Sequence, residues 1–115
     1  MNVAESGVLD LAVNVATTGT VTMSGSAATI LGVGTLTAPG YAFTNTSGTS
    51  SASVNLLGAG GLTKSGSGIG LLSGINTYSG TTSITGGVLS ITSTAALPGW
   101  DTPGRYTTSA GGALV

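Results

Sequence analysis

The first half of the chain opens with an alternation of large apolar side chains and other residues. Between Gly7 and Val15 the aliphatic residues Leu9, Leu11, Val13 and Val15 occupy every second position. A period of two residues is typical of a β-strand with one buried face, so we predict that these four side chains point into a core. The same alternation predicts strands in three shorter segments, Thr20–Ser24, Ser53–Leu56 and Val88–Thr92.

Glycine separates the predicted strands at short intervals. Turn-forming pairs and clusters lie at Thr18-Gly19, Ser24-Gly25, Pro39-Gly40, Ser47-Gly48, Gly58 to Gly61 and Gly86-Gly87. The apolar spacing of three and four residues that is typical of a helix is interrupted everywhere by glycine or β-branched residues. We therefore predict no helix longer than one turn.

Two pairs of similar segments indicate an internal repeat. Gly19–Gly25 is similar to Gly68–Gly74 at an offset of 49 residues, and Thr35–Gly40 is similar to Gly61–Gly66 at an offset of 26 residues. A unit of about 24–26 residues, used twice within the longer offset, explains both. Short strands at such a period predict a parallel β-helix, or β-solenoid, of about four to five rungs, each hydrogen-bonded to the next. We expect residues 1–115 to form one such domain or part of a longer one.

An antiparallel β-sandwich is the alternative all-β fold, because sandwiches also have a short strand roughly every 8–12 residues. Two observations favour the solenoid over the sandwich. Aromatic residues make up only 4% of the chain, which is little material for a wide sandwich core. No proline lies between Pro39 and Pro98, as expected where every rung donates backbone hydrogen bonds to its neighbour.

The composition excludes several classes of function. Charged residues are 4% of the chain and the net charge is −1, so we predict no nucleic-acid partner, which would require clustered Lys and Arg. Leu, Ile, Val and Phe number 27, enough for a folded core, and 35 Ser and Thr residues supply the polar surface. The longest weakly polar run, Ala27 to Leu36, is shorter than the ~20 residues of a membrane-spanning helix. The first residues lack the features of a signal peptide, so an exported protein would extend beyond this chain.

The sequence also offers little catalytic chemistry. Cysteine and histidine are absent, and the acidic residues Glu5, Asp10 and Asp101 form no pair or calcium-binding pattern. The segment Gly58 to Ser65 is similar to a phosphate-binding loop, but Thr63 stands where glycine is needed. We interpret Lys64 as a solvated charge at a strand edge. We predict no enzyme activity, no catalytic residues, no metal and no cofactor.

The segment Leu97 to Tyr106 differs most from the rest of the chain, and residues 98–106 predict a protruding Pro/Gly loop. It contains the only Trp, two of the three prolines and two of the five charged residues. Its candidate ligand-binding residues are Trp100, Asp101, Arg105 and Tyr106, because aromatic rings stack on sugars while polar groups bind sugar hydroxyls. The alternative is a rigid excursion between rungs, in which Asp101 pairs with Arg105 and Trp100 covers the solenoid flank.

Residues 60–97 resemble a known family. The motif runs from Gly61-Leu-Thr-Lys-Ser-Gly66 through Ser73-Gly-Ile-Asn-Thr-Tyr-Ser-Gly80-Thr-Thr-Ser-Ile84 to Gly87-Val-Leu89 and Ala95-Ala-Leu97. It is similar to the autotransporter-associated β-strand repeat of bacterial passenger regions. Two segments depart from that pattern: Gly70 stands where such repeats place an inward Leu, and Ser26 to Ile30 replaces the Asn-Thr-Tyr segment in the first half.

The resemblance implies a right-handed parallel β-helix at the bacterial outer surface or outside the cell. It implies a stalk or scaffold that aids its own secretion by folding outside the cell. We keep two alternatives open. One is an adhesin-like module that binds a glycan or cell surface through the Trp100 loop. The other is a filament subunit that associates with itself through open solenoid ends, because unpaired edge strands invite stacking.

Overall fold

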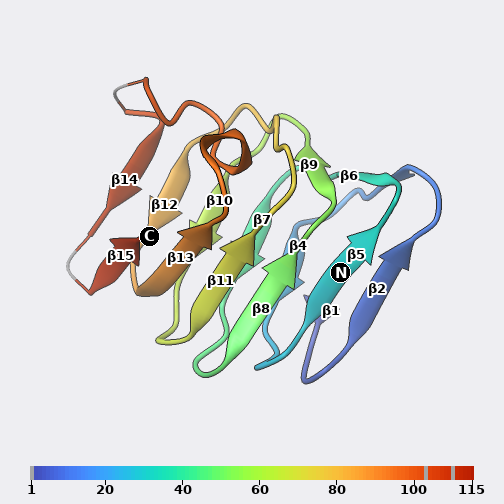
Figure 1. The fold of residues 1–115 in the computed structure, drawn as a ribbon, viewed down its shortest axis with the longest axis horizontal. Coiled ribbons are helices and arrows are strands. Elements are labelled where there is room, and N and C mark those ends of the chain that lie inside the picture. The colour runs from blue at the N-terminus through green and yellow to red at the C-terminus, as the bar shows by residue number, and fades with distance from the viewer. Residues whose placement is uncertain (1, 103, 110) are drawn as a thin grey trace.

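A computed structural model describes residues 2–102, 104–109 and 111–115 of the chain. The described strands form a parallel β-solenoid of about 5 turns (Figure 1). Every strand pair is parallel. The predicted all-β solenoid is confirmed, and the antiparallel sandwich is not the fold.

The coil has three faces, each formed by a sheet whose strands come from successive turns. The first sheet contains β1 (Asn2–Val3), β4 (Val21–Met23), β7 (Tyr41–Phe43), β10 (Leu62–Lys64), β12 (Thr82–Ile84) and β14 (Tyr106–Thr108). The second contains β2 (Val8–Leu11), β5 (Thr29–Gly32), β8 (Thr49–Ala52), β11 (Ile69–Leu72), β13 (Gly87–Ile91) and β15 (Gly112–Leu114). The third contains β3 (Val15–Ala16), β6 (Thr35–Thr37) and β9 (Asn55–Leu57).

One turn of the coil is shorter than the predicted unit of 24–26 residues. In the first sheet Val21 pairs with Tyr41, Tyr41 with Leu62 and Leu62 with Thr82, so successive turns advance by 20 or 21 residues. Only the step from Thr82 to Tyr106 is as long as predicted, because it includes the Trp100 loop. The predicted period is therefore wrong for the body of the coil.

The two offsets misled the prediction because the similar segments lie on different faces. Gly19–Gly25 contains β4 of the first sheet, whereas Gly68–Gly74 contains β11 of the second. Thr35–Gly40 contains β6 of the third sheet, whereas Gly61–Gly66 contains β10 of the first. All faces use a short strand followed by a glycine turn, so segments from different faces look alike in sequence.

The first predicted strand is divided in the structure. β2 ends at Leu11, the chain turns, and β3 begins at Val15. Val13 lies in that turn and is 68% exposed, so the prediction that it points inward is wrong. The period of two continues through the turn by coincidence. A corner between two faces cannot be recognised from alternation alone.

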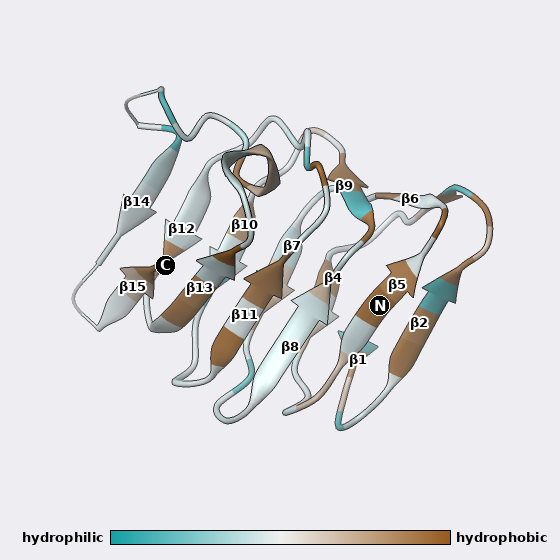
Figure 2. Cartoon of the chain, viewed as in Figure 1, coloured by the Kyte–Doolittle hydropathy of each residue, from teal (hydrophilic) through white to brown (hydrophobic). Residues whose placement is uncertain are grey.

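The core is a set of side-chain ladders that run across the rungs. On the first sheet the inward row near the strand ends is Met23, Phe43, Lys64 and Ile84, all buried. The row of Leu36 and Leu56 fills the third face, and Ile30, Ala52 and Leu72 stack on the second. Figure 2 shows that most of the coil is pale or brown, with strongly hydrophilic residues confined to short segments.

Asparagine side chains continue the third face where the sheet ends. Asn76 Oδ1 accepts a hydrogen bond from the Leu56 N–H at 2.9 Å, and Asn76 Nδ2 donates to the Ala96 carbonyl at 2.7 Å. Asn55 Oδ1 accepts from the Ile75 N–H in the same way. These amides satisfy backbone groups that a strand would otherwise pair. After β13 the same face carries a single 3₁₀ turn, η1 (Thr94–Ala96).

No helix in the described residues is long and apolar enough to cross a membrane.

Candidate functional site

The segment after η1 leaves the third face and returns to the first sheet at β14. Its path is fixed by three turn hydrogen bonds: Trp100 N–H to the Leu97 carbonyl, Thr102 N–H to the Gly99 carbonyl and Arg105 N–H to the Thr102 carbonyl. Gly99 has a φ of 72°, and a Cβ there would lie 2.6 Å from Arg105 Cβ. A side chain at this position would be strained by the backbone and by the contact, so glycine is required for this path.

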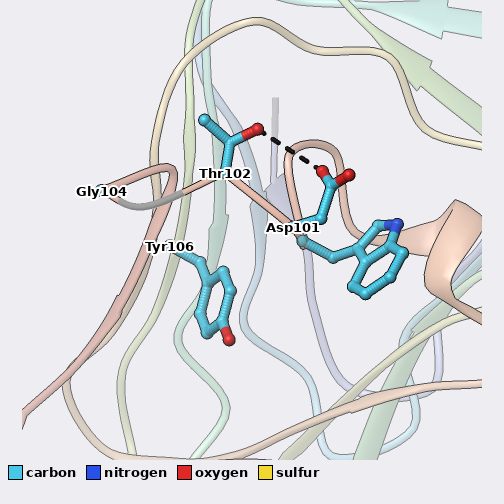
Figure 3. Close-up of a pocket in the computed structure, with 5 residues that line it drawn as sticks. Asp101, Thr102, Gly104 and Tyr106 are labelled. Atoms are coloured by element: carbon cyan, nitrogen blue, oxygen red, sulfur yellow. Dashed lines mark hydrogen bonds between the residues drawn. The ribbon is translucent and has the colours of Figure 1, made fainter.

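A surface hollow of about 360 Å³ lies on this segment. Its lining residues are Trp100, Asp101, Thr102, Gly104 and Tyr106 (Figure 3). The Trp100 side chain is 51% exposed and that of Tyr106 is 37% exposed. Thr102 Oγ1 donates a hydrogen bond to Asp101 Oδ1 at 3.4 Å. The hollow thus combines two accessible aromatic rings with one carboxylate and one hydroxyl.

Three of the four predicted ligand-binding residues line this hollow, and Arg105 does not. Arg105 Nη2 donates to the Tyr78 carbonyl at 3.4 Å, and Arg105 Nε is buried with no hydrogen-bond partner among the described residues. The alternative with an Asp101–Arg105 ion pair is therefore wrong. Arg105 anchors the loop to the previous turn instead.

Tyr78 connects the loop to the interior of the coil. Its side chain is fully buried, and its hydroxyl lies 2.6 Å from Thr82 Oγ1 on β12. Its ring packs against Tyr41 at a centroid distance of 5.9 Å. Burial raises the pKa of Tyr78 above its ordinary value. The carbonyl that holds Arg105 therefore belongs to one of the most enclosed residues of the chain.

Tyr41 is a second internal hydrogen-bonding residue. Its hydroxyl lies 2.8 Å from the Leu36 carbonyl oxygen and 2.5 Å from that of Leu57. These carbonyls belong to successive turns of the third face, so one hydroxyl bridges two rungs. Burial raises the pKa of Tyr41 to about 12.

Lys64 lies inside the coil, so its interpretation as a solvated edge charge is wrong. The side chain is fully buried, and Nζ donates to the carbonyls of Ser65 at 2.5 Å and Gly66 at 3.1 Å. Burial lowers the pKa of Lys64. The alternation on β10 could have revealed this position, because Leu62 and Lys64 share one face and Thr63 takes the other.

Glycines provide the space that Lys64 occupies. Gly70 sits on the inward face of β11, where a Cβ would lie 2.9 Å from Phe43 Cδ2 and 3.2 Å from Lys64 Cδ. A Cβ at Gly87 would lie 3.0 Å from Lys64 Nζ. Gly70, noted in the sequence as a departure from an inward Leu, thus leaves room for Phe43 and the lysine stem.

In the part of the chain that the structure describes, no group of three or more Asp, Glu, His or Cys side chains could hold a metal ion. The chemistry on offer is recognition at the hollow and hydrogen bonding within the coil.

Comparison with known proteins supports the same division. Residues 62–91 match the family model of the passenger-associated-transport-repeat. The predicted resemblance to an autotransporter passenger repeat is confirmed for this stretch, which holds Lys64, Asn76 and Tyr78. No curated protein and no solved structure matches the chain. The chain is thus a β-solenoid segment that carries a passenger-associated repeat.

Proposed function

We propose that this chain is a rigid structural segment of an exported, passenger-like bacterial protein, without enzyme activity. In this role it forms part of a stalk at the outer cell surface or outside the cell. Its folding there favours its own secretion. The observation that carries the proposal is the continuity of the ladders through the matched repeat, from β4 to β12 on the first face.

The geometry suits a stalk for a physical reason. Each rung adds ~4.8 Å to the coil, and its backbone hydrogen bonds run along the coil axis. Hydrophobic rows and the Tyr41 and Asn76 bridges join neighbouring turns, so bending or stretching the coil would break several contacts at once. The low charge leaves a surface of hydroxyls, amides and aliphatic groups, which suits a spacer.

The secretion role is tested by placing the chain between a signal peptide and an outer-membrane translocator. The wild-type segment is expected to reach the surface as a protease-resistant unit. Gly60→Ala, which places a Cβ 1.6 Å from the Pro39 carbonyl oxygen, is expected to lower surface yield, and Gly19→Ala, with open space around it, is the matched control. Equal surface yield from a demonstrably unfolded Gly60→Ala segment would contradict the secretion role. Specific hydrolase or lyase activity of the purified chain would contradict the structural one.

A second candidate function is self-association through the ends of the coil. The strands β1 and β2 at one end, and β14 and β15 at the other, each pair with a neighbour on one side only within the described chain. Thr82 N–H bonds to the Arg105 carbonyl and Ser109 N–H to the Ile84 carbonyl. Because strand residues bond alternately to the two sides, the N–H groups of Tyr106 and Thr108 face away from β12.

This candidate is tested by electron microscopy and sedimentation of the purified 115-residue chain. End-to-end filaments are expected, and Thr108→Pro should shorten them, because it removes one outward N–H without touching a bond to β12. Thr63→Ser, on the outer face of β10, serves as the control. Dispersed monomers at all concentrations would exclude filament formation.

A further inference from the structure

We propose that the hollow at Trp100 and Tyr106 is a carbohydrate site for a pyranose ring that carries no negative charge, such as a neutral hexose or an amino sugar. This activity goes beyond the structural role. It would make the segment a recognition module as well as a spacer.

The aromatic side chains are the first argument. Trp100 and Tyr106 come from different elements, a loop and strand β14, yet both line the same hollow. Both rings are substantially exposed, and the ring pair found in the described residues is Tyr41 with Tyr78, inside the coil. A sugar ring has an apolar face of C–H groups, so it gains most from aromatic faces that no other side chain covers.

The polar groups are the second argument, and they set the charge preference. Asp101 supplies a carboxylate that accepts hydrogen bonds from hydroxyl or ammonium groups, and Thr102 supplies a hydroxyl (Figure 3). No cation among the described residues lines the hollow, because Arg105 is turned toward the Tyr78 carbonyl. A uronic or sialic acid would meet Asp101 without a compensating cation, so acidic sugars are disfavoured.

The support behind the hollow is the third argument. The loop is held by its own turn hydrogen bonds and by Arg105, whose acceptor Tyr78 is fully buried. Tyr106 is fixed by the pairing of β14 with β12. A site held in shape before binding loses less conformational freedom when the ligand arrives. The volume, about 360 Å³, falls in the range of roughly 300–1,000 Å³ found for small-molecule pockets.

The chain offers a direct reporter, because Trp100 is its only tryptophan. The full 115-residue protein is titrated with methyl glycosides of a neutral hexose, a hexosamine and a uronic acid, followed by tryptophan fluorescence and calorimetry. We expect saturable protection of the indole from iodide quenching by the hexose or the hexosamine, and none by the uronic acid. A flat response to all three glycosides, or a preference for the uronic acid, would overturn the proposal.

Variants locate the site. Trp100→Ala and Tyr106→Ala should each weaken calorimetric binding at least about tenfold, whereas Trp100→Phe should retain most of it because a ring face remains. Asp101→Asn should weaken the hexosamine more than the hexose, since only the hexosamine carries a positive charge. Ile75→Ala, another exposed apolar side chain away from the hollow, is the matched control. Each variant is checked for an unchanged urea unfolding curve, and binding that survives Trp100→Ala in the folded protein would place the sugar elsewhere and overturn the site.

Discussion

The interior beneath residues 62–91 and the loop from Leu97 to Arg105 differ in how their unusual residues are held. Inside the coil, the polar residues Lys64, Asn76 and Tyr78 are buried and each forms hydrogen bonds that join segments of the coil. In the loop, Trp100 and Asp101 are exposed. The difference teaches that the polar residues of the repeat maintain the coil, whereas those of the loop are available to a ligand.

The same comparison explains why glycine is used differently in the two regions. Along the coil, neighbouring rungs approach so closely that many glycines have a backbone oxygen of the next rung where a Cβ would be. At the loop tip, Gly104 has a φ of 84°, and no atom lies within 4 Å of the position that a Cβ would take. Glycine in the coil therefore permits rung contact, and glycine at the tip permits only a turn.

The largest expected effect comes from closing the space between rungs. Gly60→Ala would put a Cβ 1.6 Å from the Pro39 carbonyl oxygen, so the two turns must separate. We expect a loss of about 3 kcal/mol or more in the free energy of unfolding, measured by urea denaturation. Gly19→Ala, which meets no atom within 4 Å, should change stability by about 0.5 kcal/mol or less. Similar losses for both variants would contradict the rung-contact explanation.

Reversing the buried charge should have a comparable or slightly smaller effect. In Lys64→Glu a carboxylate would replace the ammonium that faces the carbonyl oxygens of Ser65 and Gly66. We expect a loss of about 3 kcal/mol in urea denaturation, because an unpaired buried charge is costly. Thr63→Glu, one residue earlier on the exposed side of β10, is the control and should stay within about 0.5 kcal/mol of wild type. A tolerated Lys64→Glu would mean that position 64 is open to solvent.

The lowered pKa of Lys64 predicts a dependence of stability on pH. Between the folded pKa and the ordinary value of 10.5, the unfolded chain keeps the proton while the folded chain releases it. The unfolded state then binds more protons, so stability should rise with pH across this window and fall as pH drops through the folded pKa. Urea denaturation from about pH 7 to about pH 10 should show the rise in wild type and a flatter profile in Lys64→Met. An unchanged profile in the variant would assign the dependence to other groups.

Tyr41 gives a smaller effect of opposite sign. Tyr41→Phe removes the hydroxyl near the Leu36 and Leu57 carbonyls and should cost about 1–2 kcal/mol at neutral pH. Because burial raises the pKa of Tyr41 from 10.0 to about 12, this contribution is complete below the ordinary pKa and is lost as pH rises through about 12. The stability difference between wild type and variant should therefore shrink between about pH 9 and about pH 11. A difference that stays constant would contradict a buried, protonated hydroxyl.

The sequence was a good guide to what repeats and a poor guide to what bends. Alternating apolar residues, glycine turns and a shortage of aromatics identified the parallel coil because every rung obeys the same packing rule. The turn length and the inward position of Val13 were predicted incorrectly, because a corner between faces has no distinct sequence signal. Lys64 was assigned by its charge alone, although the alternation on β10 placed it inward. The loop stood out by composition, but only the structure separated Arg105 from the hollow, because the direction of a long side chain depends on its acceptor.

The smallest expected change in stability is that of Trp100→Ala, and it tests the comparison most directly. Trp100 is half exposed, whereas Leu97, three residues earlier, is buried in the core. Leu97→Ala should cost about 2–4 kcal/mol in urea denaturation, because it leaves a cavity in the coil. Trp100→Ala should cost about 0.5 kcal/mol or less, because the ring contributes little to the packed interior. If the two losses were equal, the loop would be part of the core, and its aromatic side chain would be needed for folding and would not be free for recognition.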